Sequence, residues 1–243
     1  MSSKPQRLFV TSKLEPGAAV TLSKDQAHYL GNVLRLKQGD NLLLFNGRDG
    51  EWWAELSAIG KKEALARPDH QTRPQENGPD LHYLFAPLKR ARLDYMVQKA
   101  TELGVSALRP VITRHTVAER IKPRRLLANA VEAAEQCGIL RVPQVMEPEK
   151  LSKLLDVWDE GRALIFADEA ASHASPIEAL KSLRPGPLAV LIGPEGGFER
   201  EERAVLLAKP FVLPISLGPR VMRADTAAVA ALALVNAALG DWQ

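Results

Sequence analysis

The chain has almost no cysteine and no long hydrophobic run. Cys137 is the single cysteine among 243 residues, which excludes a disulfide framework and a zinc site built from several cysteines. The longest uncharged apolar stretch covers 14 residues, 226–239, which is too short to cross a bilayer and suits a buried helix. The first ten residues lack the apolar segment of a signal peptide. We therefore expect a cytoplasmic protein with no membrane partner.

Familiar cofactor and nucleophile motifs are also missing. The sequence contains no G-x-G-x-x-G after a strand, no G-x-x-x-x-G-K-[ST], no H-E-x-x-H, no C-x-x-C and no G-x-S-x-G. The five histidines are scattered along the chain, at positions 28, 70, 82, 115 and 173. We therefore expect no metal site, and neither a dinucleotide site of the usual kind nor a serine hydrolase.

Charge is nearly balanced overall but uneven along the chain. The net charge is +3, and 46% apolar with 25% charged residues is the composition of an ordinary soluble globular protein. Residues 88–125 nevertheless hold ten basic side chains against three acidic ones. Such a segment can attract a polyanion such as nucleic acid, or it can be a solvated helix face. Charge alone leaves both interpretations open.

The first seventy residues have the pattern of a small β-rich module. Leu8–Val10, 41–45 and 51–59 read as strands, and the last two are joined by Asn-Gly and Asp-Gly turn signals. Ser23 is a candidate N-cap of a short helix whose apolar positions are Ala27, Leu30, Val33 and Leu34. This pattern predicts an antiparallel sheet or a small barrel.

A change of composition marks a candidate domain boundary. Residues 70–80 contain two prolines, a glycine and no aliphatic side chain, which is typical of a linker. We place the domains at 1–72 and 73–243, in keeping with a length of about 1.6 average domains. Beyond the boundary, expected strands at 81–85, 108–112, 162–167, 188–192 and 211–217 alternate with expected helices at 94–103, 123–137, 199–207 and 226–239 and a short one from Pro176. Such alternation predicts an α/β fold with a parallel sheet.

Two unusual loops follow expected strands of this sheet. Gly193–Gly197 holds three glycines around Pro194 and Glu195, and 217–226 holds Arg220 and Arg223 before the last helix. Ligands of open α/β sheets bind at the carboxyl ends of the strands, and glycine lets a ligand approach the main chain closely. The alternative interpretation is an ordinary turn at 193–197 and two solvated arginines in the second loop.

These loops, taken together with other segments, carry a resemblance to a known family. Gly-Pro-Glu-Gly-Gly-Phe at 193–198 and Leu-Gly-Pro-Arg-Val-Met-Arg-Ala-Asp-Thr-Ala at 217–227 resemble the SPOUT-class methyltransferases that modify uridine N3 in small-subunit ribosomal RNA, the ribosomal RNA small subunit methyltransferase E family. Segments 7–10 and 28–40 resemble its N-terminal PUA-like barrel, and 98–105 and 133–137 its catalytic domain. The chain departs from the family pattern at Arg114-His115, Ile139-Leu140 and Ala224-Asp225.

The resemblance implies a fold, a cofactor and a mode of assembly. The fold would be a parallel-sheet SPOUT domain with a C-terminal trefoil knot, preceded by a PUA-like β-barrel, and the protein would be a homodimer with the alanine-rich 226–239 helix packed closely at the interface. S-adenosyl-L-methionine would lie between the loops at 167–169, 193–197 and 217–223. The implied cofactor-binding residues are Gly193, Glu195, Gly197, Leu217, Gly218, Val221 and Met222.

The implied reaction is methylation of an imide nitrogen in 16S ribosomal RNA or the small ribosomal subunit. Negative charge develops on the uracil oxygens when N3 loses its proton, so Arg220 and Arg223 are the catalytic candidates. The expected RNA contacts are Arg7, Arg35, Arg92, Arg124 and Arg125. Two alternatives stay open: the same fold acting on another RNA site (a ribose 2′-hydroxyl or tRNA), and a catalytically silent RNA-binding assembly factor.

Overall fold

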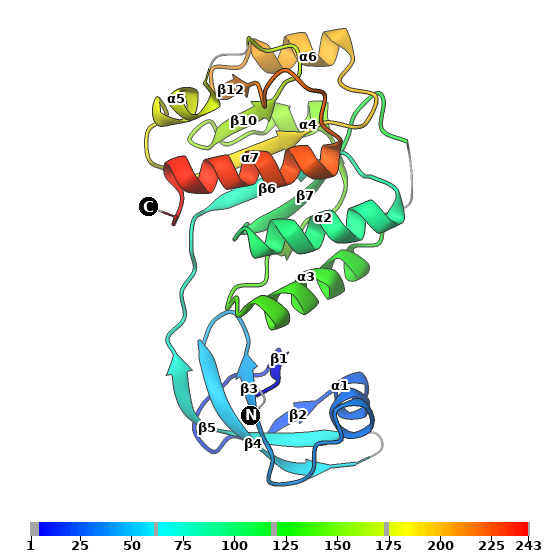
Figure 1. Cartoon of the computed structure of the whole chain (residues 1–243), viewed down its shortest axis with the longest axis vertical. Helices are drawn as coiled ribbons and strands as arrows, with labels where there is room; N and C mark the ends of the chain where they lie inside the picture. Colours follow the sequence, from blue (N-terminus) through cyan, green and yellow to red (C-terminus); the bar gives the residue numbers. More distant parts are fainter. Residues whose placement is uncertain (1–4, 61–62, 118–120, 173–174, 243) are drawn as a thin grey trace. The chain divides into compact units, whose positions relative to one another are not determined.

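The computed structural model describes residues 5–60, 63–117, 121–172 and 175–242. The chain forms two compact units (Figure 1). The N-terminal unit comprises Met1–Asn77 and Ala134–Arg141, and the C-terminal unit comprises Gly78–Ala133 and Val142–Gln243. The first unit thus includes a short segment from the middle of the chain, which sequence analysis did not anticipate.

The N-terminal unit is built on one five-stranded sheet with the order β1-β3-β4-β5-β2. Its elements are β1 (Arg7–Phe9), β2 (Val20–Leu22), α1 (Lys24–His28), η1 (Tyr29–Val33), β3 (Asn41–Phe45), β4 (Glu51–Ile59) and β5 (Ala64–Arg73). The predicted β3 and β4 are confirmed and pair in antiparallel fashion, whereas β1 runs parallel to β3. The sheet is therefore mixed, and the recorded pairings leave β1 and β2 at its two edges.

The helix that begins after Ser23 is confirmed only in its first turn. Ser23 and Gln26 form a reciprocal capping box, so α1 starts where the sequence predicts. The chain then continues as the π-helical turn η1, whose wider turn shifts the helical phase. The prediction of an apolar face through Val33 and Leu34 is consequently wrong, because Val33 is 60% exposed.

The segment expected as a linker is partly a strand. β5 continues through Arg73 and pairs with β4 along its length, so residues 70–73 belong to the sheet. The prediction went wrong because the end of β5 is polar and exposed and carries none of the aliphatic residues by which a strand is recognised. The two compact units divide at Asn77 and Gly78.

The C-terminal unit is an α/β structure with a seven-stranded parallel sheet. Its elements are β6 (Leu81–Phe85), α2 (Arg90–Glu102), β7 (Ala107–Ile112), α3 (Pro123–Cys137), β8 (Gln144–Val145), β9 (Glu149–Lys150), α4 (Leu151–Asp156), β10 (Ala163–Ala167), α5 (Pro176–Lys181), β11 (Leu188–Ile192), α6 (Arg200–Leu207), β12 (Val212–Ile215) and α7 (Ala224–Leu239). The final residues of α3 belong to the N-terminal unit. The α/β prediction is confirmed, while β8, β9 and α4 were not foreseen. The trefoil knot stays a prediction.

Strand order in this sheet brings three loops to one place. The order is β12-β10-β11-β6-β7-β8, with β9 beside β7, and every pairing is parallel. β10 therefore lies between β12 and β11. Because the carboxyl ends of parallel strands share one edge, the segments that follow these three strands are neighbours.

Helices cover both faces of the sheet (Figure 1). The strand side chains alternate between two cores. Tyr83 and Phe85 belong to the core that includes α2 and α7, whereas Leu84 belongs to the core that includes α4. β11 is buried at all five positions, which explains its purely aliphatic sequence. Packing on both faces thereby fixes the strands, and the strands position the loops at their carboxyl ends.

Candidate functional site

A cavity of about 640 Å³ lies at the carboxyl ends of β10, β11 and β12. Its walls come from the loops that follow these strands, Ala167–Ala170, Gly193–Phe198 and Leu217–Arg223, and from Arg92, Arg203 and the start of α7. The cavity lining includes every residue expected to bind the cofactor or to act in catalysis: Gly193, Glu195, Gly197, Leu217, Gly218, Arg220, Val221, Met222 and Arg223. The two loops singled out in the sequence, 193–197 and 217–226, thus meet at one cavity.

The loop after β11 is a tight turn that needs its glycines. The Gly197 amide donates to the carbonyl of Pro194 at 2.9 Å, and Gly197 has a left-handed backbone with φ 69°. A Cβ atom on Gly193 would lie 2.9 Å from Cδ2 of Phe198 and still closer to Cε2. Phe198 in turn packs edge-on against Phe166 of β10, with ring centroids 5.0 Å apart. The loop is therefore shaped by close packing at Gly193 and by the turn at Gly197.

A buried carboxylate fixes the loop after β10. The side chain of Asp168 is 3% exposed and receives two nitrogens of Arg203 from α6, with Nη2–Oδ2 at 2.8 Å and Nε–Oδ2 at 3.0 Å. Asp168 also accepts the amide of Ala170 at 3.1 Å. The carboxylate raises the pKa of Arg203 above its usual range. This bidentate pair ties one cavity wall to α6, and sequence reasoning missed Arg203 because its partner comes from a different element.

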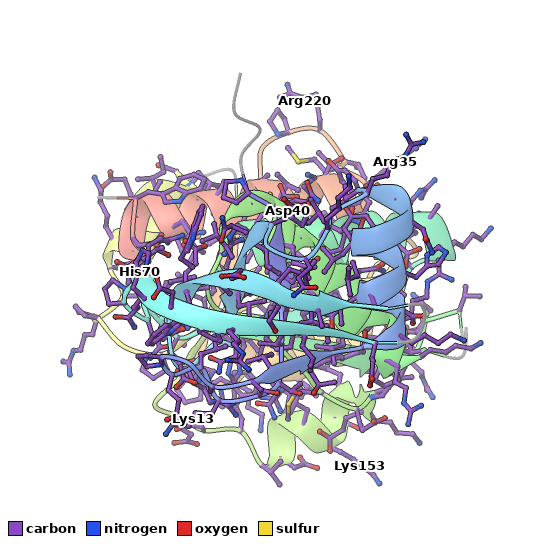
Figure 2. All side chains as sticks on the ribbon, turned by 90° about the horizontal axis from the view of Figure 1, so that it is seen from below. Lys13, Arg35, Asp40, His70, Lys153 and Arg220 are labelled. Atoms are coloured by element: carbon purple, nitrogen blue, oxygen red, sulfur yellow. The ribbon has the colours of Figure 1, made fainter. Side chains whose placement is uncertain are left out.

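The third loop presents two cations to the cavity. Arg220 and Arg223 are exposed, and the structure records no ion pair for either among the residues it describes. Figure 2 shows Arg220 projecting from the outer side of this loop. Gly218 has φ 105°, and its amide donates to the Ser216 hydroxyl at 3.2 Å. Arg223 occupies the N-cap position of α7 without a side-chain cap. Both guanidinium groups are thus available to a bound anion.

Two residues that we expected to act separately bind each other. Arg92, an expected RNA contact on α2, forms an ion pair with Glu195, an expected cofactor contact on the loop after β11. Both side chains are partly exposed and line the same cavity. Glu195 is consequently held at the cavity wall by a cation.

The remaining expected RNA contacts differ in their environments. Arg125 forms a bidentate ion pair with Asp94, which also accepts the Asn129 amide at 2.7 Å. Arg124 is exposed, and no partner is recorded for its side chain within the described part of the chain. Arg35 is exposed with a left-handed backbone (φ 58°), a conformation that non-glycine residues seldom adopt. Arg124 and Arg35 are therefore the two of these that are exposed and have no recorded side-chain partner among the described residues.

Arg7, the fifth expected RNA contact, makes its contacts within the protein, and its RNA contact stays a prediction. Its side chain is 11% exposed and donates to Glu51 at 2.6 Å and to the carbonyls of Ala134 and Glu135 at 2.6 and 3.0 Å. The guanidinium also lies 4.5 Å from the centre of the Phe45 ring. Arg7 thereby holds the C-terminal turn of α3 within the N-terminal unit, and its donors are occupied by protein.

The described residues contain neither a cluster of metal-binding side chains nor a membrane-spanning helix. No group of three or more His, Cys, Asp or Glu side chains is placed to hold a metal ion there. Across the same ranges, no helix is both long enough and apolar enough to cross a membrane.

Two family models and several named relatives match this chain. The family model described as an RNA methyltransferase domain matches residues 75–236, and the one described as an RNA methyltransferase PUA domain matches 22–69. The ribosomal RNA small subunit methyltransferase E of Rickettsia conorii is 33% identical over 96% of both chains, and that of Bacillus subtilis is 26% identical over 95% of this chain and 96% of its own.

Solved structures give the same result. A methyltransferase from Legionella pneumophila, described in complex with bound SAM, has a TM-score of 0.87 at 31% identity and covers 98% of this chain and 100% of its own. The ribosomal RNA small subunit methyltransferase E of Neisseria gonorrhoeae, described as bound to S-adenosyl methionine, has a TM-score of 0.87 at 28% identity and the same coverage. Matched along nearly its whole length in sequence and in structure, the chain belongs to the ribosomal RNA small subunit methyltransferase E family.

Proposed function

We propose that this protein transfers the methyl group of S-adenosylmethionine to N3 of a uridine in small-subunit ribosomal RNA. The observation that carries the proposal is the meeting of three loops, two of them glycine-containing, around one cavity with two available arginines. Its volume of about 640 Å³ lies within the range of small-molecule sites. Two structurally similar relatives are described with this cofactor bound.

The cavity fits the cofactor through its main chain. Gly193 and Gly218 let a ligand approach the backbone, and peptide groups of Gly197, Leu217 and Met222 are the proposed partners of the adenine and ribose. Glu195 and Val221 complete the proposed cofactor contacts. When bound, S-adenosylmethionine supplies a methyl group on a positively charged sulfur. The loops would hold this group in line with the attacking nitrogen.

The chain's own contribution to the reaction is electrostatic. Uridine N3 must first lose its proton to solvent. Its lone pair would then form the new N–CH3 bond as the S–CH3 bond breaks and S-adenosylhomocysteine leaves. Arg220 and Arg223 would stabilise the negative charge that loss of the proton creates on the flanking carbonyl oxygens. Glu195, held by Arg92, is a carboxylate and thus a weak base for an imide proton. We therefore assign the catalytic role to the arginines and a positional role to Glu195.

Nucleoside analysis tests the reaction directly. Incubation with labelled S-adenosylmethionine and small ribosomal subunits should yield 3-methyluridine, detected by mass spectrometry of the digested RNA. Ribose methylation, or methylation of tRNA alone, would show that the fold acts on another RNA site. If RNA binds but calorimetry detects no binding of S-adenosylmethionine, the protein is a silent assembly factor and the proposal fails.

Variants test the catalytic assignment. Arg220→Ala and Arg223→Ala should each lower kcat by roughly 100-fold, the loss expected when a donor to a developing oxyanion is removed. Their affinity for S-adenosylmethionine should change little. Arg184→Ala serves as the control, because Arg184 is an exposed arginine of the same unit that does not line the cavity. Equal activities of all three variants would contradict the assignment.

RNA binding, assembly and location complete the proposal. Because Arg124 is exposed, Arg124→Ala should reduce the slope of log affinity against log salt by about 1, and an unchanged slope would remove Arg124 from the RNA contacts. The N-terminal unit would bind RNA, and the C-terminal unit would carry out catalysis. We further propose a cytoplasmic homodimer, although Ala227, Ala228 and Ala231 of α7 are buried within this chain's own core. Light scattering of the purified protein tests the dimer.

A further inference from the structure

His115 contacts the glycine loop of the cavity from outside. It follows β7, and its Nδ1 lies 3.1 Å from the carbonyl oxygen of Gly196 and 3.2 Å from that of Gly197. Its Nε2 lies 3.2 Å from a carboxylate oxygen of Glu199, the N-cap residue of α6. Gly197 lines the cavity, whereas His115 does not. The ring therefore joins a cavity loop to the beginning of the next helix without touching the space where a ligand would bind.

All the recorded partners of the ring are hydrogen-bond acceptors. Two carbonyl oxygens face Nδ1 and a carboxylate oxygen faces Nε2. A neutral imidazole carries one N–H and would direct a lone pair at one of these oxygens, whereas the imidazolium donates from both nitrogens. Hydrogen bonds from a charged donor are also shorter and stronger. Both ring nitrogens can thus donate to these oxygens only when the ring is protonated.

The charged groups around His115 come from several elements. From α6, Glu199 faces the ring and Glu202 accepts the amide of the neighbouring Arg114 at 2.9 Å. From the loop after β10, Glu169 lies beside Gly197. The amide of Arg200 lowers the pKa of Glu199, with a smaller contribution from His115. Glu199 therefore stays ionised at neutral pH.

We propose that His115 is a positioning residue whose protonated side chain holds the Gly193–Gly197 loop in the shape that receives S-adenosylmethionine. This inference rests on the proposed function, because it concerns affinity for the same cofactor. Loss of the ring proton removes one of the two donors, so cofactor affinity is higher with the protonated ring than with the neutral ring.

Calorimetry with S-adenosylmethionine on the full-length protein tests this proposal, because turnover would also carry the pH dependence of N3 deprotonation. His115→Ala should weaken binding roughly tenfold at about pH 6, the loss expected for hydrogen bonds from a charged donor. His115→Asn should retain most of the affinity, since its amide can donate to the same carbonyls, but without the change between about pH 6 and pH 8.

A matched control separates this effect from general properties of histidine. His70 is also exposed and also has a ring nitrogen near a carboxylate, with its Nδ1 2.9 Å from Asp69, but it belongs to the N-terminal unit. His70→Asn should keep the affinity and pH dependence of the unaltered protein. The inference is overturned if His115→Ala binds like the unaltered protein at both pH values, or if His115→Asn keeps the full pH dependence. Failure of the unaltered protein to bind the cofactor at either pH would instead overturn the proposed function.

Discussion

Gly193 is the position where one added methyl group should have the largest local effect. In Gly193→Ala the new Cβ would lie 2.9 and 3.0 Å from Cδ2 and Cζ of Phe198, where ordinary contact begins at 3.4 Å. The ring cannot retreat freely because it packs edge-on against Phe166, which is fully buried. Either Phe198 or the glycine loop must move. Overpacking of this kind costs about 1–3 kcal/mol of the free energy of unfolding.

The same substitution should weaken cofactor binding, because the residues that would be displaced line the cavity. Urea denaturation gives the loss of stability and calorimetry with S-adenosylmethionine gives the affinity. Gly186→Ala is the control, since its Cβ would meet no atom within 4 Å. Adding Phe198→Leu to Gly193→Ala removes the clashing ring atoms and should restore part of both losses, measured as a coupling energy. If Gly193→Ala matches the unaltered protein in stability and affinity, the packing argument is refuted.

Three further predictions concern buried charges. Asp168→Asn should destabilise the protein by about 1–3 kcal/mol in urea, because Arg203 loses its bidentate partner; equal stability would show that the pair contributes nothing. Burial lowers the pKa of His82 to about 4. The unfolded chain therefore takes up a proton at this side chain near pH 6.5, whereas the folded state does not. Up to about 3 kcal/mol of the free energy of unfolding is lost as the pH falls from about 6.5 to 4. Urea denaturation of His82→Gln at several pH values should show a smaller loss. Arg7→Ala should lower the melting temperature, because Glu51 is left buried without its cation; a loss of RNA affinity at unchanged stability would contradict this structural role and support the expected RNA contact.

Local patterns were sufficient where a segment carries its own signal. The predicted bounds of β3, β4, α3 and β11 agree with the structure residue for residue. Pro123 begins α3, and Gly138 follows it with a left-handed backbone, so both ends are specified by residues adjacent in the chain. β2, β8 and β9 have only two or three residues each, which is too few for a periodic pattern, and they were missed.

Pairings between distant residues could not be read from the sequence. Arg92 and Arg125 resemble other basic side chains of their segment, yet Glu195 and Asp94 hold them in ion pairs. Arg7 lies at the start of the chain, and its carbonyl partners lie more than a hundred residues later. Whether a side chain is free to bind a ligand depends on which element packs against it, and this cannot be predicted from composition.

By itself, the sequence determined the scarcity of cysteine and long apolar runs, the alternation of strands and helices, and the two unusual loops at strand ends. These are properties of neighbouring residues, because turn chemistry, capping and periodicity act over a few positions. Tertiary structure alone decided that β10 lies between β12 and β11, and this order brings the three loops around one cavity. It also decided which arginines stay free, because an ion pair forms between side chains that only the folded chain brings within reach.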